Sequence, residues 1–218
     1  METLNRKILL NTVIFVCALI SIVFDFMDNP LYNVFKPITT TLVVLLTILT
    51  KDVNNAFRRL LIAALCFCLL GDILLLKNEY FVFGLAAFLI GHLLFAKGFI
   101  RLKGFQKNII ILLTLMVIGI GFYIWLYPDL RALKYPVAVY VLVILFMAWQ
   151  GIGLYFADKS KANRFIAFGV ILFIFSDSIL AINKFRTPFE LSGLVILSTY
   201  WLAITLIANG SSIGLKRT

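Results

Sequence analysis

The feature that most constrains this chain is a series of apolar runs, each about as long as a helix needs to cross a bilayer. A membrane-spanning helix takes about 20 predominantly apolar residues. Eight such runs fall near residues 8–26, 31–50, 59–76, 80–100, 108–127, 136–157, 163–182 and 190–209. Because few residues lie outside them, we predict an all-α polytopic membrane protein. It would be a bundle of eight transmembrane helices that forms a single integral membrane domain over residues 1–218.

The composition excludes several other classes of protein. Hydrophobic residues make up 62% of the chain and charged residues 14%, with a mean hydropathy of +1.04. Soluble domains average about 45 to 50% apolar and about 25% charged residues. A soluble domain, a nucleic-acid-binding domain and a disordered tail are therefore excluded. The formal net charge of +10 comes from cations in the connecting segments, so we expect a lipid bilayer, and no nucleic acid, as the partner.

The distribution of those cations predicts the orientation in the membrane. An even number of spans places both termini on one side. The two tails and the alternate loops on that side carry 14 of the 20 Lys and Arg residues, and the opposite loops carry the other six. Cytoplasmic loops are enriched in Lys and Arg, so we predict a multi-pass protein of the cell membrane with cytoplasmic N- and C-termini.

Two aspartates lie inside apolar runs, where a charge costs at least about 2.5 to 3.5 kcal/mol. Asp72 lies 13 residues beyond Arg59, and Asp177 lies 13 residues beyond Arg164. At 1.5 Å per residue, both lie roughly 20 Å from the cytoplasmic boundary. Since the third and seventh runs cross in the same direction, we expect the two carboxylates to share one pocket.

The surroundings of these aspartates also suggest an internal repeat. Residues 66–76 align with residues 171–181 so that Asp72 falls on Asp177. Spans four apart in order run in the same direction, as expected for parallel repeats about an axis along the membrane normal. The alternative is a chance similarity between two apolar helices.

Four further polar residues are candidates for substrate binding at the same depth or above it. Lys36 lies near the external end of the second run, His92 near the middle of the fourth, and Tyr200 near the middle of the eighth. Asn183 follows the seventh run at the external mouth above Asp177. Three of them have a structural alternative: Lys36 as an interhelical ion pair with one aspartate, His92 as a hydrogen-bonded structural group, and Tyr200 as a packing aromatic.

We expect no cofactor and no metal. The three cysteines, Cys17, Cys66 and Cys68, all lie in apolar runs, where cysteine behaves as a small hydrophobic residue. One histidine and two aspartates on separate helices are a thin ligand set for a metal such as zinc.

Five segments carry a family resemblance. They are Phe35-Lys36-Pro37-Ile38-Thr39-Thr40, Leu69-Leu70-Gly71-Asp72, the stretch from Gly84 to Phe95 that includes Gly91-His92, Phe175-Ser176-Asp177-Ser178-Ile179-Leu180-Ala181, and Thr199-Tyr200. In this order and spacing, the chain resembles the YhhN family, which includes the mammalian transmembrane lysoplasmalogenases. No single segment is specific, but the ordered set is.

The resemblance implies a lysophospholipid substrate and a hydrolytic reaction. The vinyl ether bond of a lysoplasmalogen would be cleaved to a fatty aldehyde and glycerophosphoethanolamine or glycerophosphocholine. Such a bond is hydrolysed by protonation of an alkene carbon, which gives an oxocarbenium ion that water attacks. Two neighbouring carboxyls in an apolar environment do not both ionise, so they supply a neutral acid and an anion. Glycosidases use a carboxyl pair in a similar way. We therefore expect Asp72 and Asp177 to be the catalytic pair, with neither assigned as the acid.

Two other functions are compatible with the same residues. Intramembrane carboxylates together with Lys36 and His92 are also typical of a proton or cation path in a small transporter, and a repeat fits that function too. A non-catalytic lipid-binding protein is the third possibility. The sequence carries no indication of the oligomeric state.

Overall fold

The computed structural model describes residues 2–49 and 54–212, and within them the chain folds into eight long α-helices without a strand. The helices are α1 (Glu2–Phe26), α2 (Tyr32–Leu49), α3 (Asn55–Leu74), α4 (Phe81–Lys103), α5 (Ile109–Leu126), α6 (Lys134–Ala157), α7 (Lys161–Ala181) and α8 (Ser192–Ser212). Each contains most of one apolar run, so the predicted all-α membrane fold is confirmed. Seven of the eight are long and apolar enough to span a bilayer. The exception, α3, carries Arg58, Arg59 and Asp72 within its 20 residues.

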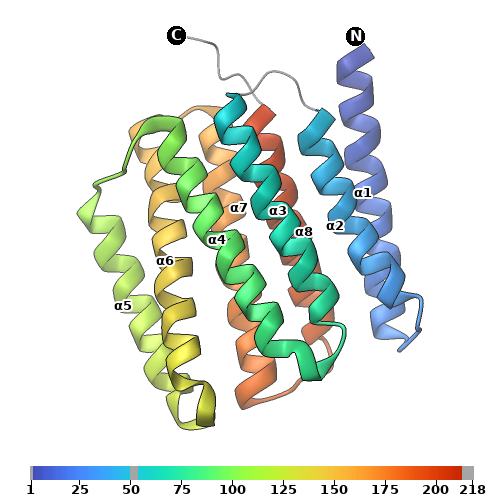
Figure 1. Cartoon of the computed structure of the whole chain (residues 1–218), viewed down its shortest axis with the longest axis vertical. Coiled ribbons are helices and arrows are strands. Elements are labelled where there is room, and N and C mark those ends of the chain that lie inside the picture. Colours follow the sequence, from blue (N-terminus) through green and yellow to red (C-terminus); the bar gives the residue numbers. More distant parts are fainter. Residues whose placement is uncertain (1, 50–53, 213–218) are drawn as a thin grey trace.

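Six of the helices form a closed ring. In order around it, α2, α3, α4, α6, α7 and α8 each pack against the next, and α8 packs back against α2. The other two helices lie outside the ring, at opposite edges of the molecule (Figure 1). There, α1 packs against α2 and α8, and α5 packs mainly against α6. Side chains from all six ring helices can therefore meet in the interior of the ring.

The packing has an approximate twofold symmetry that agrees with the sequence repeat. The first half of the chain packs as α1 on α2, α2 on α3 and α3 on α4, and the second half packs as α5 on α6, α6 on α7 and α7 on α8. The two halves meet through α4 with α6, and through α8 with α1 and α2. The alignment of Asp72 with Asp177 thus corresponds to equivalent positions of α3 and α7.

Small residues allow the closest helix pairs to form. A Cβ atom added at Gly91 of α4 would lie 3.2 Å from the backbone oxygen of Ala64 in α3. A Cβ atom added at Gly169 of α7 would lie 2.7 Å from the backbone oxygen of Ala203 in α8. In membranes, where apolar burial does not drive helix association, such close backbone contact is a main source of packing energy.

Polar caps define one end of the bundle. The side chains of Asn54, Asn108 and Ser160 accept hydrogen bonds from the first backbone N–H groups of α3, α5 and α7, which otherwise have no partner. At the same end, Lys103, the last residue of α4, donates a hydrogen bond to Asp158, which follows α6. This hydrogen bond to the Lys103 ammonium holds the pKa of Asp158 below its usual range.

The first helix begins and the last helix ends at this capped end (Figure 1). This agrees with the even number of spans. The assignment of the capped end to the cytoplasm stays a prediction from the charges.

Candidate functional site

Each of the six ring helices supplies a polar side chain to one buried group, which we call the polar cluster. Its members share the middle and the uncapped half of the bundle: Lys36 and Thr40 on α2, Asp72 on α3, His92 on α4, Tyr140 on α6, Asp177 on α7 and Tyr200 on α8. Because the ring is closed, these residues from separate parts of the chain come together only in the folded protein.

Asp72 is held by two hydroxyl groups. Its Oδ2 atom accepts hydrogen bonds from Thr40 Oγ1 at 2.6 Å and from the Tyr200 hydroxyl at 2.8 Å. The Trp201 indole N–H donates to Thr40 Oγ1 at 3.2 Å, so the Thr40 hydroxyl proton is directed at the carboxylate. With an exposed fraction of 2%, Asp72 is a buried carboxylate in a fixed position.

Asp177 is held by a tyrosine and the histidine. Its Oδ2 atom accepts a hydrogen bond from the Tyr140 hydroxyl at 2.6 Å, and His92 Nε2 lies 3.2 Å from the same oxygen and 3.0 Å from the Tyr140 oxygen. His92 Nδ1 is buried and has no hydrogen-bond partner within residues 2–49 and 54–212. A proton at Nδ1 would therefore be unpaired, which favours the tautomer in which Nε2–H donates to Asp177 and Tyr140.

The hydrogen bonds to the two aspartates follow the same pattern. Each accepts one bond from its own half of the chain, Thr40 for Asp72 and Tyr140 for Asp177, and one from the other half, Tyr200 and His92 respectively. In both, the bonds fall on Oδ2, and among the described residues none is formed by Oδ1. One oxygen of each carboxyl thus holds it in place while the other is available for chemistry.

Both aspartates line one cavity, here called the polar cavity. It has about 800 Å³ of empty space including its mouth, and the loops at its rim place that mouth at the uncapped end. Lys36, Tyr200 and Asn183 also line it. Lys36 is buried, with 7% exposed, and its ammonium lies 5.5 Å from the centre of the Tyr32 ring.

The charge of Lys36 acts on Asp72, and also on Asp25 of α1. Within the described parts of the chain, no ion pair joins Lys36 to Asp72 or Asp177. The structural alternative of an interhelical ion pair is therefore not present, and Lys36 is one of the residues that line the polar cavity.

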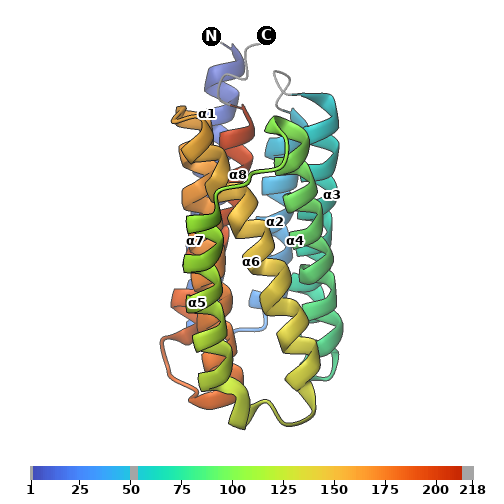
Figure 2. The ribbon, with the colours of Figure 1, turned by 90° about the vertical axis from the view of Figure 1, so that its left-hand side faces the viewer.

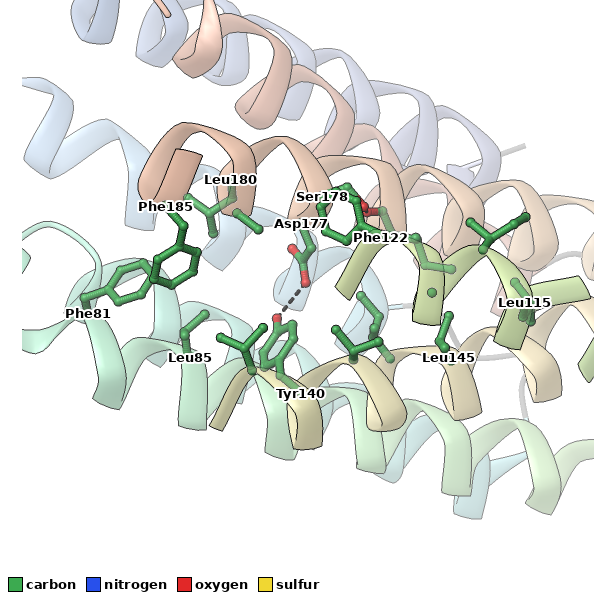
Figure 3. A pocket seen from close by; sticks show the side chains of 17 residues that line it. Phe81, Leu85, Leu115, Phe122, Tyr140, Leu145, Asp177, Ser178, Leu180 and Phe185 are labelled. Atoms are coloured by element: carbon green, nitrogen blue, oxygen red, sulfur yellow. Dashed lines mark hydrogen bonds between the residues drawn. The ribbon is translucent and has the colours of Figure 1, made fainter. Parts of the chain in front are cut away.

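A second, apolar cavity, drawn in Figure 3, shares the lining residues Phe81, Asp177 and Leu180 with the polar cavity. This apolar cavity lies among α4, α5, α6 and α7 and has about 780 Å³ of empty space including its opening. Apart from Tyr140, Asp177 and Ser178, its lining is made of hydrocarbon and aromatic side chains and one glycine. Asp177 lines both cavities, whereas Asp72 lines only the polar one.

The other candidates from the sequence lie at different places around this junction. His92 is fully buried and reaches Asp177 without lining either cavity. Asn183 lines the polar cavity, but its side-chain oxygen accepts the Phe189 backbone N–H at 3.2 Å and so also holds the loop before α8.

Tyr140 is the residue that sequence reasoning missed. It lies within an apolar run of α6 among valines and leucines, where a tyrosine is as often a packing aromatic as a functional one. Only the fold shows its hydroxyl on Asp177. As for metals, the described residues contain no group of three or more His, Cys, Asp or Glu side chains placed to hold an ion.

Comparisons with a family profile and with individual proteins point to the same family. The YhhN family profile matches residues 31–211. Lysoplasmalogenase TMEM86A of Bos taurus is 38% identical over 152 residues, which cover 66% of this chain and 61% of that protein. Lysoplasmalogenase TMEM86B of Rattus norvegicus is 32% identical over 166 residues, which cover 75% of this chain and 66% of that protein.

A bacterial relative matches over a longer part of its length. The membrane protein YhhN of Escherichia coli O157:H7 is 26% identical over 177 residues, 81% of this chain and 85% of that protein. The chain spans less than two thirds of the TMEM86A relatives that it matches. No solved structure matches it.

Proposed function

Because this chain belongs to the YhhN family, whose relatives include proteins named lysoplasmalogenase, we propose that it hydrolyses the vinyl ether bond of lysoplasmalogens. The products would be a fatty aldehyde and a glycerophospho-base. Membership of the family supports the class of reaction. The geometry of the two cavities supports the location of the reaction within the protein.

The observation that carries the proposal is the position of Asp177 between a polar and an apolar cavity. A lysoplasmalogen has a charged head group at one end, a hydrocarbon chain at the other, and the vinyl ether between them. With the head group in the polar cavity and the chain in the apolar cavity, the vinyl ether lies beside Asp177. A proton or cation path has no need of the apolar cavity, so this geometry favours a lipid substrate over the transport alternative.

The same geometry assigns different roles to the two aspartates. Protonation occurs at the alkene carbon on the chain side, one bond further into the apolar cavity than the carbon that water attacks. Asp177 reaches the apolar cavity and is therefore the proton donor. Asp72 lies only in the polar cavity, where water has access, and it interacts with the charge of Lys36. Asp72 is therefore the anion that faces the oxocarbenium ion and accepts a proton from the attacking water.

The two carboxyls return to their starting states within one turnover. Asp177 gives its proton to carbon, and Asp72 takes one proton from water as the hemiacetal forms. When the hemiacetal collapses, its hydroxyl proton passes to Asp177, the carbon–oxygen bond to glycerol breaks, and Asp72 protonates the departing oxygen. The sum is one water consumed and no net change at either carboxyl.

The reaction is tested with purified protein and three lipids in heavy water. Lysoplasmalogen is expected to release an aldehyde that carries one deuterium on the carbon next to the carbonyl, as read by mass spectrometry after rapid trapping. The matching saturated ether lipid and the matching ester lipid are expected to stay intact. Lipid-dependent stabilisation of the protein without turnover would instead indicate the non-catalytic lipid-binding alternative.

Lys36 lines the polar cavity, where its ammonium would bind the phosphate of the lysoplasmalogen head group. Replacing Lys36 by Met is therefore expected to weaken substrate binding. Loss of one charge-assisted hydrogen bond costs about 1.5 to 3 kcal/mol, so KM for lysoplasmalogen should rise about tenfold or more. An alkenylglycerol without phosphate should keep its KM. If Lys36→Met slows both substrates equally and through kcat, the lysine acts through Asp72 and not on the phosphate.

Replacing Tyr140 by Phe is expected to lower kcat with little change in KM. The hydroxyl positions Asp177 by a 2.6 Å bond, and loss of a hydrogen bond to a carboxylate costs about 1.5 to 3 kcal/mol, or about 10- to 150-fold in rate. Tyr123→Phe is a matched control, because that hydroxyl donates to the Lys134 backbone oxygen away from both cavities. Equal turnover by the Tyr140→Phe variant and the parent protein would remove Tyr140 from the mechanism.

A further inference from the structure

The apolar cavity is lined by α4, α5, α6 and α7. In Figure 2, α6 runs obliquely, beside α7 near the capped end and apart from it near the opposite end. The outer helix α5 packs mainly on α6 and lines one side of the cavity. Leu115 and Leu145 lie at one end of the cavity and Phe81 and Phe185 at the other, with the Tyr140–Asp177 hydrogen bond between them (Figure 3).

The cavity is too short to enclose the whole chain of a membrane lipid. Its lining on α6 runs from Val137 to Leu145, which at 1.5 Å per residue is about 12 Å. Only about 7 Å of this lies beyond Tyr140, on the side of Leu145. One leaflet of a bilayer has a hydrocarbon thickness of roughly 15 Å, half of about 30 Å. A chain that begins at Asp177 must therefore leave the cavity before it ends.

The lining itself shows where such a chain can leave. Ile118 of α5 lines the cavity and is nevertheless 60% exposed on the outer surface, so it lies at the rim. At the loop end, the Phe81 and Phe185 rings pack edge to face with centres 5.8 Å apart, and Lys184 lies 4.6 Å above the Phe81 ring. The loop end is lined by this aromatic pair beside a cation, whereas the rim along α5 presents an exposed hydrocarbon side chain, as expected of a surface in the bilayer.

We propose that the apolar cavity is a lateral entry site for a lipid chain, which passes Ile118 from the bilayer and brings the reactive bond to Asp177. The occupant is the single hydrocarbon chain of a lysophospholipid. The cavity binds the carbons next to the vinyl ether, and the rest of the chain stays in the membrane beside α5. That this chain is an alkenyl chain rests on the proposed function; that a lipid chain binds here does not.

The first test uses a substitution that narrows the opening of the cavity at Ile118. Ile118→Trp is expected to lower kcat/KM for hexadecenyl lysoplasmalogen about tenfold or more, since small misplacements of a reacting group have large effects on rate. A short butenyl analogue, which need not pass the rim, should be hydrolysed as before. Val117→Trp is the matched control, because Val117 is the neighbouring residue, is 74% exposed and does not line the cavity. An Ile118→Trp variant that hydrolyses the long substrate normally, or slows both substrates equally, would overturn lateral entry at this edge.

The second test does not depend on turnover. A saturated alkyl lysophospholipid with a photoreactive diazirine in the first half of its chain is bound to the protein in vesicles, irradiated, and located by peptide mass spectrometry. Labels are expected on the facing parts of α5, α6 and α7 that line the cavity, with loss of these labels in Ile118→Trp. Labels confined to other outer surfaces would overturn the chain site. If the labels appear here but no vinyl ether is hydrolysed, the chain site stands and the proposed reaction fails.

Discussion

Replacing Asp177 by Asn is expected to abolish aldehyde release while the protein stays folded in the membrane. As the proposed donor of the proton to carbon, Asp177 supplies general acid catalysis, which typically contributes about 100- to 10,000-fold in rate. The substitution suits the site, because both hydrogen bonds to Asp177 end on one oxygen. The amide oxygen of Asn can accept both hydrogen bonds. Its NH₂ group then takes the place of the Oδ1 oxygen, and an amide N–H is too weak an acid to protonate the alkene.

The measurement compares initial rates of aldehyde formation from lysoplasmalogen at equal amounts of folded protein. Thermal unfolding in detergent checks the fold. Asp129→Asn is the control, since Asp129 lies in the loop after α5, pairs with Arg186 and lines neither cavity. It should retain full turnover. An Asp177→Asn variant with normal turnover would refute the role of Asp177 as the acid.

Much of the fold follows from the sequence because the bilayer imposes few solutions. Each apolar run must satisfy its own backbone hydrogen bonds, so it forms a helix, and its length limits where it begins and ends. The depth of Asp72 and Asp177 could be derived from residue counts alone, since helical rise is constant. Their placement on equivalent helices was also visible in the alignment of residues 66–76 with 171–181.

The partners of each aspartate could not be derived in this way. Residue counts fix depth but not the direction in which a helix turns its side chains, and that direction depends on how the ring closes. Tyr200 bonds to Asp72 because α8 packs against α2 and α3, and His92 reaches Asp177 across the ring from α4. Tyr140 has an ordinary apolar sequence around it, so nothing distinguished it from a packing residue before the fold was known.

The apolar cavity was equally hidden, because it forms where four helices from separate parts of the chain pack together and not from any motif. Its lining residues are the same types that face lipid elsewhere in the chain. The cavity differs from the lipid-facing surface in one respect, which is that the Asp177 carboxyl lines it as well as the polar cavity. The difference between the two aspartates, invisible in their similar hydrogen bonds, arises from the space that each one faces.

This difference predicts a distinct result for Asp72→Asn. Without the carboxylate that accepts a proton from water, turnover is expected to fall by about 100- to 10,000-fold, but Asp177 still protonates the alkene. With water attack slowed, the oxocarbenium ion re-forms the vinyl ether more often than it goes forward. Once the carbon–carbon bond, now single, has rotated, the proton that Asp177 takes back is the original hydrogen, and the added deuterium stays on the carbon. In heavy water, lysoplasmalogen recovered from Asp72→Asn should therefore carry deuterium on the vinyl carbon that belongs to the chain.

The Asp177→Asn variant provides the contrast, since it is expected to leave the recovered substrate without deuterium. Both variants are predicted to lose turnover, so rates alone cannot separate their roles, whereas the label can. Thr40 and Tyr200 both bond to a single oxygen of Asp72, so Asn at position 72 can keep these bonds and the geometry of the cavity. Deuterium in substrate recovered from Asp177→Asn but not from Asp72→Asn would reverse the assignment, making Asp72 the acid and Asp177 the base.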